Sequence, residues 1–331
     1  MTARRLAAAG LILLIAAGAF VWLFPSNTYI FLPDRAHAVA PIVMVQGGKD
    51  PNDGGGIYFV DIFVRKASLL ERLWPGIHEG GQLVPASAVL PAGTSEKQRR
   101  QADAREMTRS QEVAAAVALR AAGYKVVANP TGALVEQVDP SVPAAGRLQP
   151  TDIIVSANGK RVRVPGDLRR VVGALHPGDT VRLVIRRGSD QKPVEVRTVR
   201  DTDGRTIIGV IVDQAAFVKL PRRVNIDAGN VGGPSAGLPF ALGVLEELGK
   251  DVDHGRRVAA TGQIELDGTV TPIGGVRQKT IGVRESGIRV FLVPAGENAE
   301  EARRYAHGVR IIPVRNFQQA LHALATLRRA S

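Results

Sequence analysis

Ser235 stands in the run Gly233-Pro-Ser-Ala-Gly237, which matches G-x-S-x-G at the start of an apolar stretch. In α/β-hydrolases this pattern forms a tight turn between a strand and a helix, and the turn exposes a nucleophilic serine hydroxyl. Such an enzyme needs an acid and a histidine downstream, and the histidines after Ser235 are His254, His307 and His322. None of the three lies in a motif that supports this role, so an esterase that pairs Ser235 with a histidine is one hypothesis among others.

A second candidate for chemistry is Lys279, in the run GGVRQKTIGVRESG from Gly274 to Gly287. On a helix beginning at Val276, Lys279 shares a face with Val276 and Val283, which places an amine in an apolar stripe. A buried lysine loses hydration and its pKa falls toward neutrality, as a general base requires. The same spacing fits a lysine that extends along the stripe to solvent. Position alone leaves both interpretations open.

The elements that must position these two side chains alternate between strands and helices after Thr206. Strands are expected at 206–212, 223–229, 288–294 and 309–314, and helices at 235–249, from Val276, at 300–306 and after the capping residue Asn316. Asp267-Gly268 predicts a hairpin turn within the segment 257–273. Pro239 has no N–H for the Ser235 carbonyl, so the first of these helices must begin after Ser235 or bend there. The pattern is that of a mixed α/β domain.

Two segments closely resemble the proteolytic domain of the Lon family, GGPSAG at 232–237 and TGQIELDGTVTPIGGVRQK at 261–279. The resemblance implies that Ser235 is the nucleophile of a serine-lysine dyad and Lys279 its general base. Thr261 matches the family threonine that orients the lysine. By the same resemblance the activity is that of a serine-type endopeptidase, which forms an acyl-enzyme.

The glycine-rich turn ahead of the serine is expected to supply the oxyanion hole. Its backbone positions are Gly232, Gly233 and Pro234, at the start of a helix. Gly232 stands where ATP-dependent Lon members commonly carry an acidic residue, and Gln263 where they commonly carry glutamate. The chain has no G-x-x-x-x-G-K-[ST] motif, so an activity without ATP-driven unfolding is expected.

The segment 124–203 differs from the rest of the chain, because it is predicted to contain only short strands, turns and one small helix. Its run from Ser141 to Val162, followed by DLRRVV and PGDTVRLVIRRG, resembles a PDZ domain of the kind associated with bacterial proteases. Asn158-Gly159 predicts a hairpin turn within it. PDZ domains capture peptide C-termini at a sheet edge, although no Gly-Leu-Gly-Phe-like loop is visible near Tyr124.

Upstream of this module, 42–64 is predicted to form a strand pair around a glycine-rich turn, and 75–101 a loop. Thr108 and Gln111 have the spacing of a capping box, which predicts that a helix begins there and ends at Gly123. This helix and the strand at 55–64 resemble the first elements of the Lon proteolytic domain.

The N-terminus predicts a membrane anchor. Leu6 to Phe24 carries no charge and would extend about 28 Å as a helix, close to the thickness of a bilayer core. Arg4 and Arg5 precede it and predict a cytoplasmic N-terminus with the bulk of the chain outside. The alternative is a signal peptide cleaved after the small residues at 36–40.

Composition excludes several other classes of function. The chain has no cysteine, which rules out disulfides, thiolate metal sites and a cysteine nucleophile. The net charge is +12, but the arginines are scattered and aromatic residues are only 5%, so nucleic-acid binding is not expected. No cofactor is predicted, and the Asp251 to Gly255 loop is too solvated a pattern to predict a metal site.

Together these features predict an α+β chain with four parts: 1–25 as cytoplasmic tip and transmembrane helix, 40–123 as the first part of a Lon-like protease domain, 124–203 as an inserted PDZ-like domain, and 204–331 as the catalytic part. The predicted function is an ATP-independent, membrane-anchored serine endopeptidase that cleaves unfolded or PDZ-presented proteins. Expected partners are protein or peptide substrates, membrane lipid and, by family resemblance, further copies of the chain. The alternative is an inactive PDZ-bearing membrane scaffold.

Overall fold

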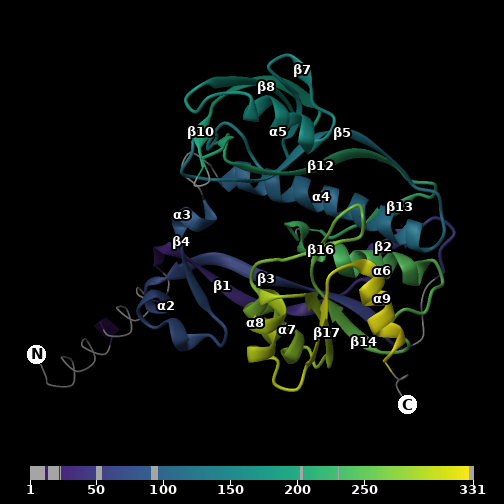
Figure 1. The fold of residues 1–331 in the computed structure, drawn as a ribbon. Coiled ribbons are helices and arrows are strands. Elements are labelled where there is room, and N and C mark those ends of the chain that lie inside the picture. Colours follow the sequence, from purple (N-terminus) through teal and green to yellow (C-terminus); the bar gives the residue numbers. More distant parts are fainter. Residues whose placement is uncertain are drawn as a thin grey trace, which may run out of the picture.

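The computed structural model describes residues 24–49, 54–90, 96–201, 204–229 and 231–327, together with Ile12, Leu13 and Trp22. It contains a larger α/β body and a smaller β-rich body, which two long neighbouring strands connect (Figure 1). The buried apolar side chains of the smaller body form a cluster separate from those of the larger one. The described part of the chain is therefore a mixed α+β fold with separate cores.

A six-stranded sheet with the order β18-β17-β14-β3-β1-β4 forms the framework of the larger body. Its strands are β1 (Pro25–Ala38), β3 (Gly56–Ser68), β4 (Gln82–Pro85), β14 (Arg257–Ala260), β17 (Val290–Pro294) and β18 (Arg310–Val314). Strands β3, β14, β17 and β18 are parallel, whereas β1 is antiparallel to both β3 and β4. The sheet therefore has a parallel half, where the strands and helices expected from the sequence alternate.

Helices cover both faces of the parallel half: α4 (Glu96–Ala121), α6 (Gly237–Glu247) and α9 (Phe317–Ala325) on one face, and α7 (Val276–Glu285) and α8 (Glu297–Tyr305) on the other. Leu292 of β17 joins the core under the first group, and its neighbours Phe291 and Val293 join the core under the second. A strand buried on both faces is apolar throughout, which explains why β17 was predictable from sequence. The Asn316 side chain accepts a hydrogen bond from the Gln319 N–H, so the predicted cap of α9 is confirmed.

The predicted hairpin at 42–64 is wrong. Its first strand, β2 (Val43–Val45), pairs with β13 (Val224–Ile226), and its second, β3, pairs with β1. Strand β1 follows the N-terminal apolar run and was not predicted. Because β1 and β13 provide the partners, proximity along the chain did not decide the pairing.

The helix expected from Thr108 begins earlier. Helix α4 starts at Glu96, and the Thr108 hydroxyl donates to the Ala104 carbonyl inside it, so the predicted capping box is wrong. The segment 75–101, predicted to be a loop, contains η2 (Pro75–Ile77), β4, α3 (Ala86–Val89) and the first turns of α4. The early half of α4 is rich in charged residues and has no apolar stripe to mark it in the sequence.

The smaller body is a sheet with the order β12-β5-β6-β8-β9, to which β7 is added, together with helix α5 (Pro165–Gly173). The strands are β5 (Val127–Val138), β6 (Ile153–Ala157), β7 (Lys160–Arg161), β8 (Thr180–Arg187), β9 (Asp190–Arg197) and β12 (Val210–Lys219). Asn158 and Gly159 both have positive φ in the β6–β7 turn, which confirms the predicted hairpin. Strand β12 completes this sheet beside β5, so the sheet continues beyond the boundary expected at residue 203.

The run 206–212, predicted to be one strand, is divided at Gly209, which has φ +69°. Strands β11 (Thr206–Ile207) and β12 lie on either side of it, and β11 pairs with β10 (Val199–Arg200). Glycine adopts this left-handed conformation without the strain that a side chain would introduce.

The predicted anchor, Leu6 to Phe24, lies mostly outside the described residues. In the ranges that the structure describes, none of the helices combines the length and apolar character needed to cross a bilayer.

Candidate active site

Ser235 lies in a short 3-10 turn, η3 (Pro234–Ala236), immediately before α6. Because Pro239 cannot donate, the Ser235 carbonyl accepts instead from the Gly262 N–H at 2.8 Å and from the Thr261 hydroxyl at 3.2 Å. The helix therefore begins after Ser235, the first of the two arrangements that the sequence allowed. Gly233 has φ +84°, a conformation that turns the chain sharply into the serine.

Lys279 is in the second turn of α7 and points into the larger body, where it is 2% exposed. Its Nζ atom lies 2.7 Å from the Ser235 Oγ atom and 3.3 Å from the Thr261 Oγ1 atom. Burial lowers the pKa of Lys279 to about 8. The structure therefore brings the serine, the lysine and the threonine predicted from sequence into one hydrogen-bonded group.

Thr261 is fixed at the end of β14, where its N–H donates to the Leu292 carbonyl of β17. Its hydroxyl donates to the Ser235 carbonyl and accepts from Lys279 Nζ. The hairpin of β15 (Gln263–Ile264) and β16 (Val270–Thr271) follows at once, with Gly268 at φ +89°, so the predicted turn is confirmed. Thr261 thereby connects the end of strand β14 to both the turn that carries Ser235 and the lysine.

Close packing sets the position of α7. A Cβ atom on Gly282 would lie 1.9 Å from the Asp34 carbonyl oxygen of β1, so only glycine allows the helix to approach this strand. The side-chain amide of Gln278 donates to the Gly80 carbonyl at 2.8 Å. These contacts hold the helix on both sides of Lys279.

Asp61 of β3 is a charged neighbour of the lysine that sequence reasoning missed. Burial raises the pKa of the Asp61 carboxyl, while the Ile62 N–H and Lys279 act in the opposite direction. The carboxylate in turn favours the ammonium form of Lys279 and so opposes the effect of burial. The sequence feature that could have identified Asp61 is its place as the single acid in the β-rich run GIYFVDIFV.

In the turn Gly232–Pro234, which was expected to supply the oxyanion hole, not every residue has a backbone N–H that is free to donate. The Gly233 N–H donates to the Asp103 carbonyl of α4 at 3.4 Å, and a Cβ atom on Gly232 would lie 3.1 Å from Asp103 Cβ. Pro234 has no N–H, so it can shape the turn but cannot be a donor. Helix α4 therefore packs directly against the turn that carries Ser235.

The histidines of the esterase hypothesis lie elsewhere. His254 pairs with Asp251 in a loop, with 3.4 Å between Nδ1 and Oδ1, and His322 is on α9. His307 follows α8 and has φ +35°. Across the described ranges, no hydrogen bond joins Ser235 to a histidine, whereas Lys279 is in direct contact with it.

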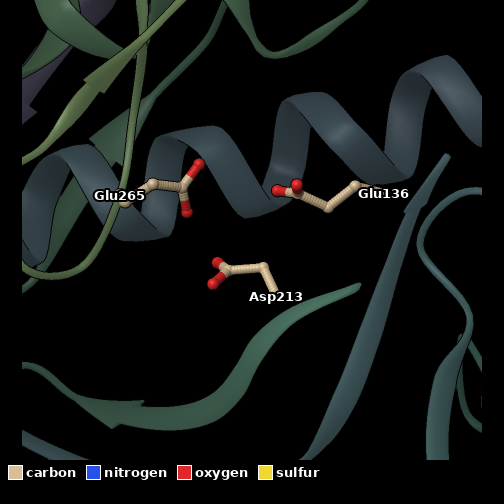
Figure 2. A group of neighbouring side chains, drawn as sticks. All are labelled: Glu136, Asp213 and Glu265. Carbon is tan, nitrogen blue, oxygen red and sulfur yellow. The ribbon is translucent and has the colours of Figure 1, made fainter. Parts of the chain in front are cut away.

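One acidic cluster lies at the junction of the two bodies. Glu136 of β5, Asp213 of β12 and Glu265 after β15 point toward one another (Figure 2), with carboxylate oxygens within 4.8 Å of each other. Arg109 of α4 donates to Asp213 at 3.0 Å and to Glu265 at 3.3 Å, and the Gln263 side-chain amide donates to Glu265 at 2.7 Å. This oxygen set has the chemistry of a divalent-cation site, and Arg109 already supplies part of the positive charge.

Burial, together with a hydrogen bond to Asp213, raises the pKa of Glu265 to about 7. Burial also raises the pKa of Glu136. No motif in the sequence brings these acids together, because they are far apart along the chain.

Comparison with known proteins finds two families along the chain, although the matched ranges do not follow the boundary between the two bodies: the range nearer the N-terminus begins within α4, and the other includes β12. Residues 209–326 match the Lon protease (S16) C-terminal proteolytic domain, and residues 107–198 match the PDZ domain. These matches support a protease. The fold therefore combines a PDZ-like domain with a Lon-like proteolytic domain.

The similar proteins are much longer than the aligned part. Lon protease 2 of Bacillus subtilis is 35% identical over 109 residues, which cover 33% of this chain and 18% of that protein. Lon protease 1 of Sorangium cellulosum is 32% identical over 146 residues, which cover 41% and 17%. Among solved structures, the PDZ domain of an SdrC-like protein from Listeria monocytogenes is 24% identical, covers 25% of this chain and 87% of that one, and gives a TM-score of 0.24. The chain thus spans less than a fifth of either Lon relative.

Proposed function

We propose that the protein is an ATP-independent serine endopeptidase in which Ser235 is the nucleophile and Lys279 the general base. The observation that carries the proposal is the 2.7 Å separation of Lys279 Nζ and Ser235 Oγ, with the amine buried and its pKa lowered to about 8. A base poised near neutrality takes up a proton without a large energetic penalty. The sequence contains no Walker A motif, so the substrates are unstructured or presented by the PDZ-like domain.

The reaction begins with neutral Lys279, whose lone pair accepts the Ser235 hydroxyl proton. The serine oxygen attacks the peptide carbonyl carbon, and the carbonyl electron pair moves onto the oxygen. Collapse of this intermediate breaks the C–N bond, and the Lys279 ammonium gives its proton to the leaving amine. Water then attacks the acyl-enzyme with Lys279 again as base, which releases the acid and restores the serine.

Thr261 is a positioning residue for the lysine. A neutral amine has two N–H groups and one lone pair, and an N–H donated to Thr261 Oγ1 directs the lone pair toward Ser235. The Thr261 hydroxyl proton is already committed to the Ser235 carbonyl. This fixed direction keeps the threonine an acceptor toward Lys279.

The Ser235 N–H, near the start of η3, is the proposed principal oxyanion donor. The first amides of a helical turn have no acceptor within the turn and favour negative charge. The Gly232 N–H is the second proposed donor, since the Gly233 N–H is directed to Asp103.

The proposed location is the outer face of a membrane, with the uncharged run Leu6–Phe24 as anchor and the PDZ-like domain delivering peptides. Its basis is the sequence, in which two arginines precede an apolar run of bilayer length.

The test uses the full-length protein in detergent, incubated with an unfolded protein in the absence of nucleotide. Wild type cleaves it, while Ser235→Ala and Lys279→Ala do not. His254→Ala is the matched control and retains activity. Loss of activity in the histidine variant alone would favour the esterase arrangement, and an inactive wild type would leave the scaffold alternative.

A further inference from the structure

Helix α2 (Leu69–Leu73) exposes a large apolar side chain at its C-terminal end and buries its acid, while Leu69 and Leu70 are half-buried. It buries Glu71, which is 2% exposed, and presents Leu73 and the following Trp74 to the outside, 78% and 69% exposed. A short helix at an aqueous surface normally buries leucine and tryptophan and exposes glutamate. Two neighbouring large apolar side chains with this exposure form a surface that an apolar environment would cover favourably.

The exposed side chains are held on a well-fixed turn. Glu71 accepts from Arg65 and from the Ser68 N–H, each at 2.8 Å, and its Oε1 lies 2.7 Å from Nε2 of His78. These hydrogen bonds, that of Arg65 above all, lower the pKa of Glu71 to about 2. Because the acid is anchored from three sides, Leu73 and Trp74 are presented by a capped turn and not by a frayed end.

The same surface adjoins the end of the apolar N-terminal run. The Phe24 carbonyl accepts the Leu69 N–H at 3.0 Å, which ties the last residue of Leu6–Phe24 to the first residue of α2. Phe24 is 51% exposed, and Ile77, one short turn beyond Trp74, is 39% exposed. In Figure 1, α2 lies at one end of the molecule, away from the PDZ-like sheet.

We propose that Phe24, Leu73, Trp74 and Ile77, together the α2 patch, insert into the interfacial layer of a lipid bilayer. Tryptophan favours this layer because its ring is apolar while its N–H can remain hydrated. Lys66 and Arg72, which precede Leu73 in the sequence, are exposed and suit anionic headgroups. The inference rests on the membrane location proposed above and deepens it: the folded body lies on the bilayer instead of extending from it on a free linker.

The test exploits the fact that the chain has two tryptophans, Trp22 and Trp74. The full-length Trp22→Phe protein is reconstituted in phosphatidylcholine–phosphatidylglycerol vesicles, with or without bromine on the upper acyl chain. Contact with bromine quenches tryptophan, so we expect blue-shifted Trp74 emission that falls roughly twofold in brominated vesicles. The reciprocal Trp74→Phe protein reports Trp22 alone.

The matched control places a tryptophan at another exposed aromatic position. Phe217 of β12 is 63% exposed, and Phe217→Trp in the chain lacking both native tryptophans is expected to show no bromine quenching. If the protein floats with the vesicles but bromine does not quench Trp74, the inference is overturned and the proposed membrane location stands. A blue shift without quenching would also overturn it, because another protein surface would then cover the patch. If the wild-type protein does not float with the vesicles, both the patch inference and the proposed membrane location are refuted. The proteolysis assay in detergent tests the catalytic proposal separately from either.

Discussion

Lys279 Nζ and Ser235 Oγ lie 2.7 Å apart although 44 residues separate them in the chain. The contact depends on two helices on opposite faces of the sheet, α6 after the serine and α7 around the lysine. The two side chains meet at the carboxyl end of the parallel strands, where Thr261 follows β14. A site at the carboxyl ends of parallel strands is the usual arrangement in open α/β sheets.

Replacing Lys279 with methionine should abolish proteolysis and stabilise the fold at neutral pH. The pKa of Lys279 in the folded protein, about 8, lies below the usual lysine value. As the pH falls, the unfolded chain takes up this proton first, so the folded state is progressively destabilised until Lys279 itself is protonated below about pH 8. Lys279→Met removes this pH-dependent destabilisation, and we expect the free energy of unfolding to rise by about 1 to 3 kcal/mol near pH 7. Urea unfolding measures it. An activity loss accompanied by reduced stability would instead indicate a structural lysine.

Proteolysis should rise with pH along a curve with an apparent pKa of about 8. Only the neutral amine accepts the serine proton, and burial sets the fraction that is neutral. Removing the opposing carboxylate in Asp61→Asn should move the midpoint to lower pH. The check is kcat/KM for a fluorogenic peptide across pH. A flat profile would argue against a lysine base.

Thr261→Val should reduce kcat by about 10- to 100-fold, because the lysine loses its acceptor and the Ser235 carbonyl loses a donor. Thr261→Ser keeps the hydroxyl and should recover most of the activity. If the threonine acts by orienting the amine, the midpoint of the pH profile shifts in the valine variant and not in the serine variant. Equal profiles would reduce Thr261 to a packing role.

Gly282→Ala should displace α7 and impair catalysis without touching the reacting groups. The added Cβ would meet the Asp34 carbonyl at 1.9 Å, which is backbone and cannot rotate away. We expect a destabilisation of about 2 kcal/mol or more, with a lower kcat. Gly274→Ala is the matched control, because no atom lies within 4 Å of its added Cβ. Similar behaviour of the two variants would refute the packing argument.

Glu265→Gln should stabilise the protein at alkaline pH and weaken its pH dependence. The folded-state pKa of about 7 lies above the usual glutamate value, so the contribution of this group is present at low pH and lost as pH rises through about 7. Urea unfolding at about pH 5 and about pH 8 should therefore show a gain of about 1 to 2 kcal/mol only at the higher value. Glu195→Gln, on exposed β9, is the control and should change neither.

The site was more predictable than the pairing of the strands. Ser235, Lys279 and Thr261 lie in short motifs that resemble the Lon proteolytic domain, and this resemblance, not local pattern alone, singled them out; the structure places them in contact. The partners of β2 and β3 depend on β1 and β13, which no local pattern identifies. The acids around Glu265 come from three separate strands and turns, so only the assembled fold brings them together.

Strands β5 and β12 enter and leave the PDZ-like domain side by side, with Val127 opposite Lys219. A segment whose two ends meet can be added to or removed from a host without opening a gap in it, and here host and guest keep separate cores. The junction is accordingly a point at which the smaller domain could be exchanged for another while the body that holds Ser235 and Lys279 stays intact.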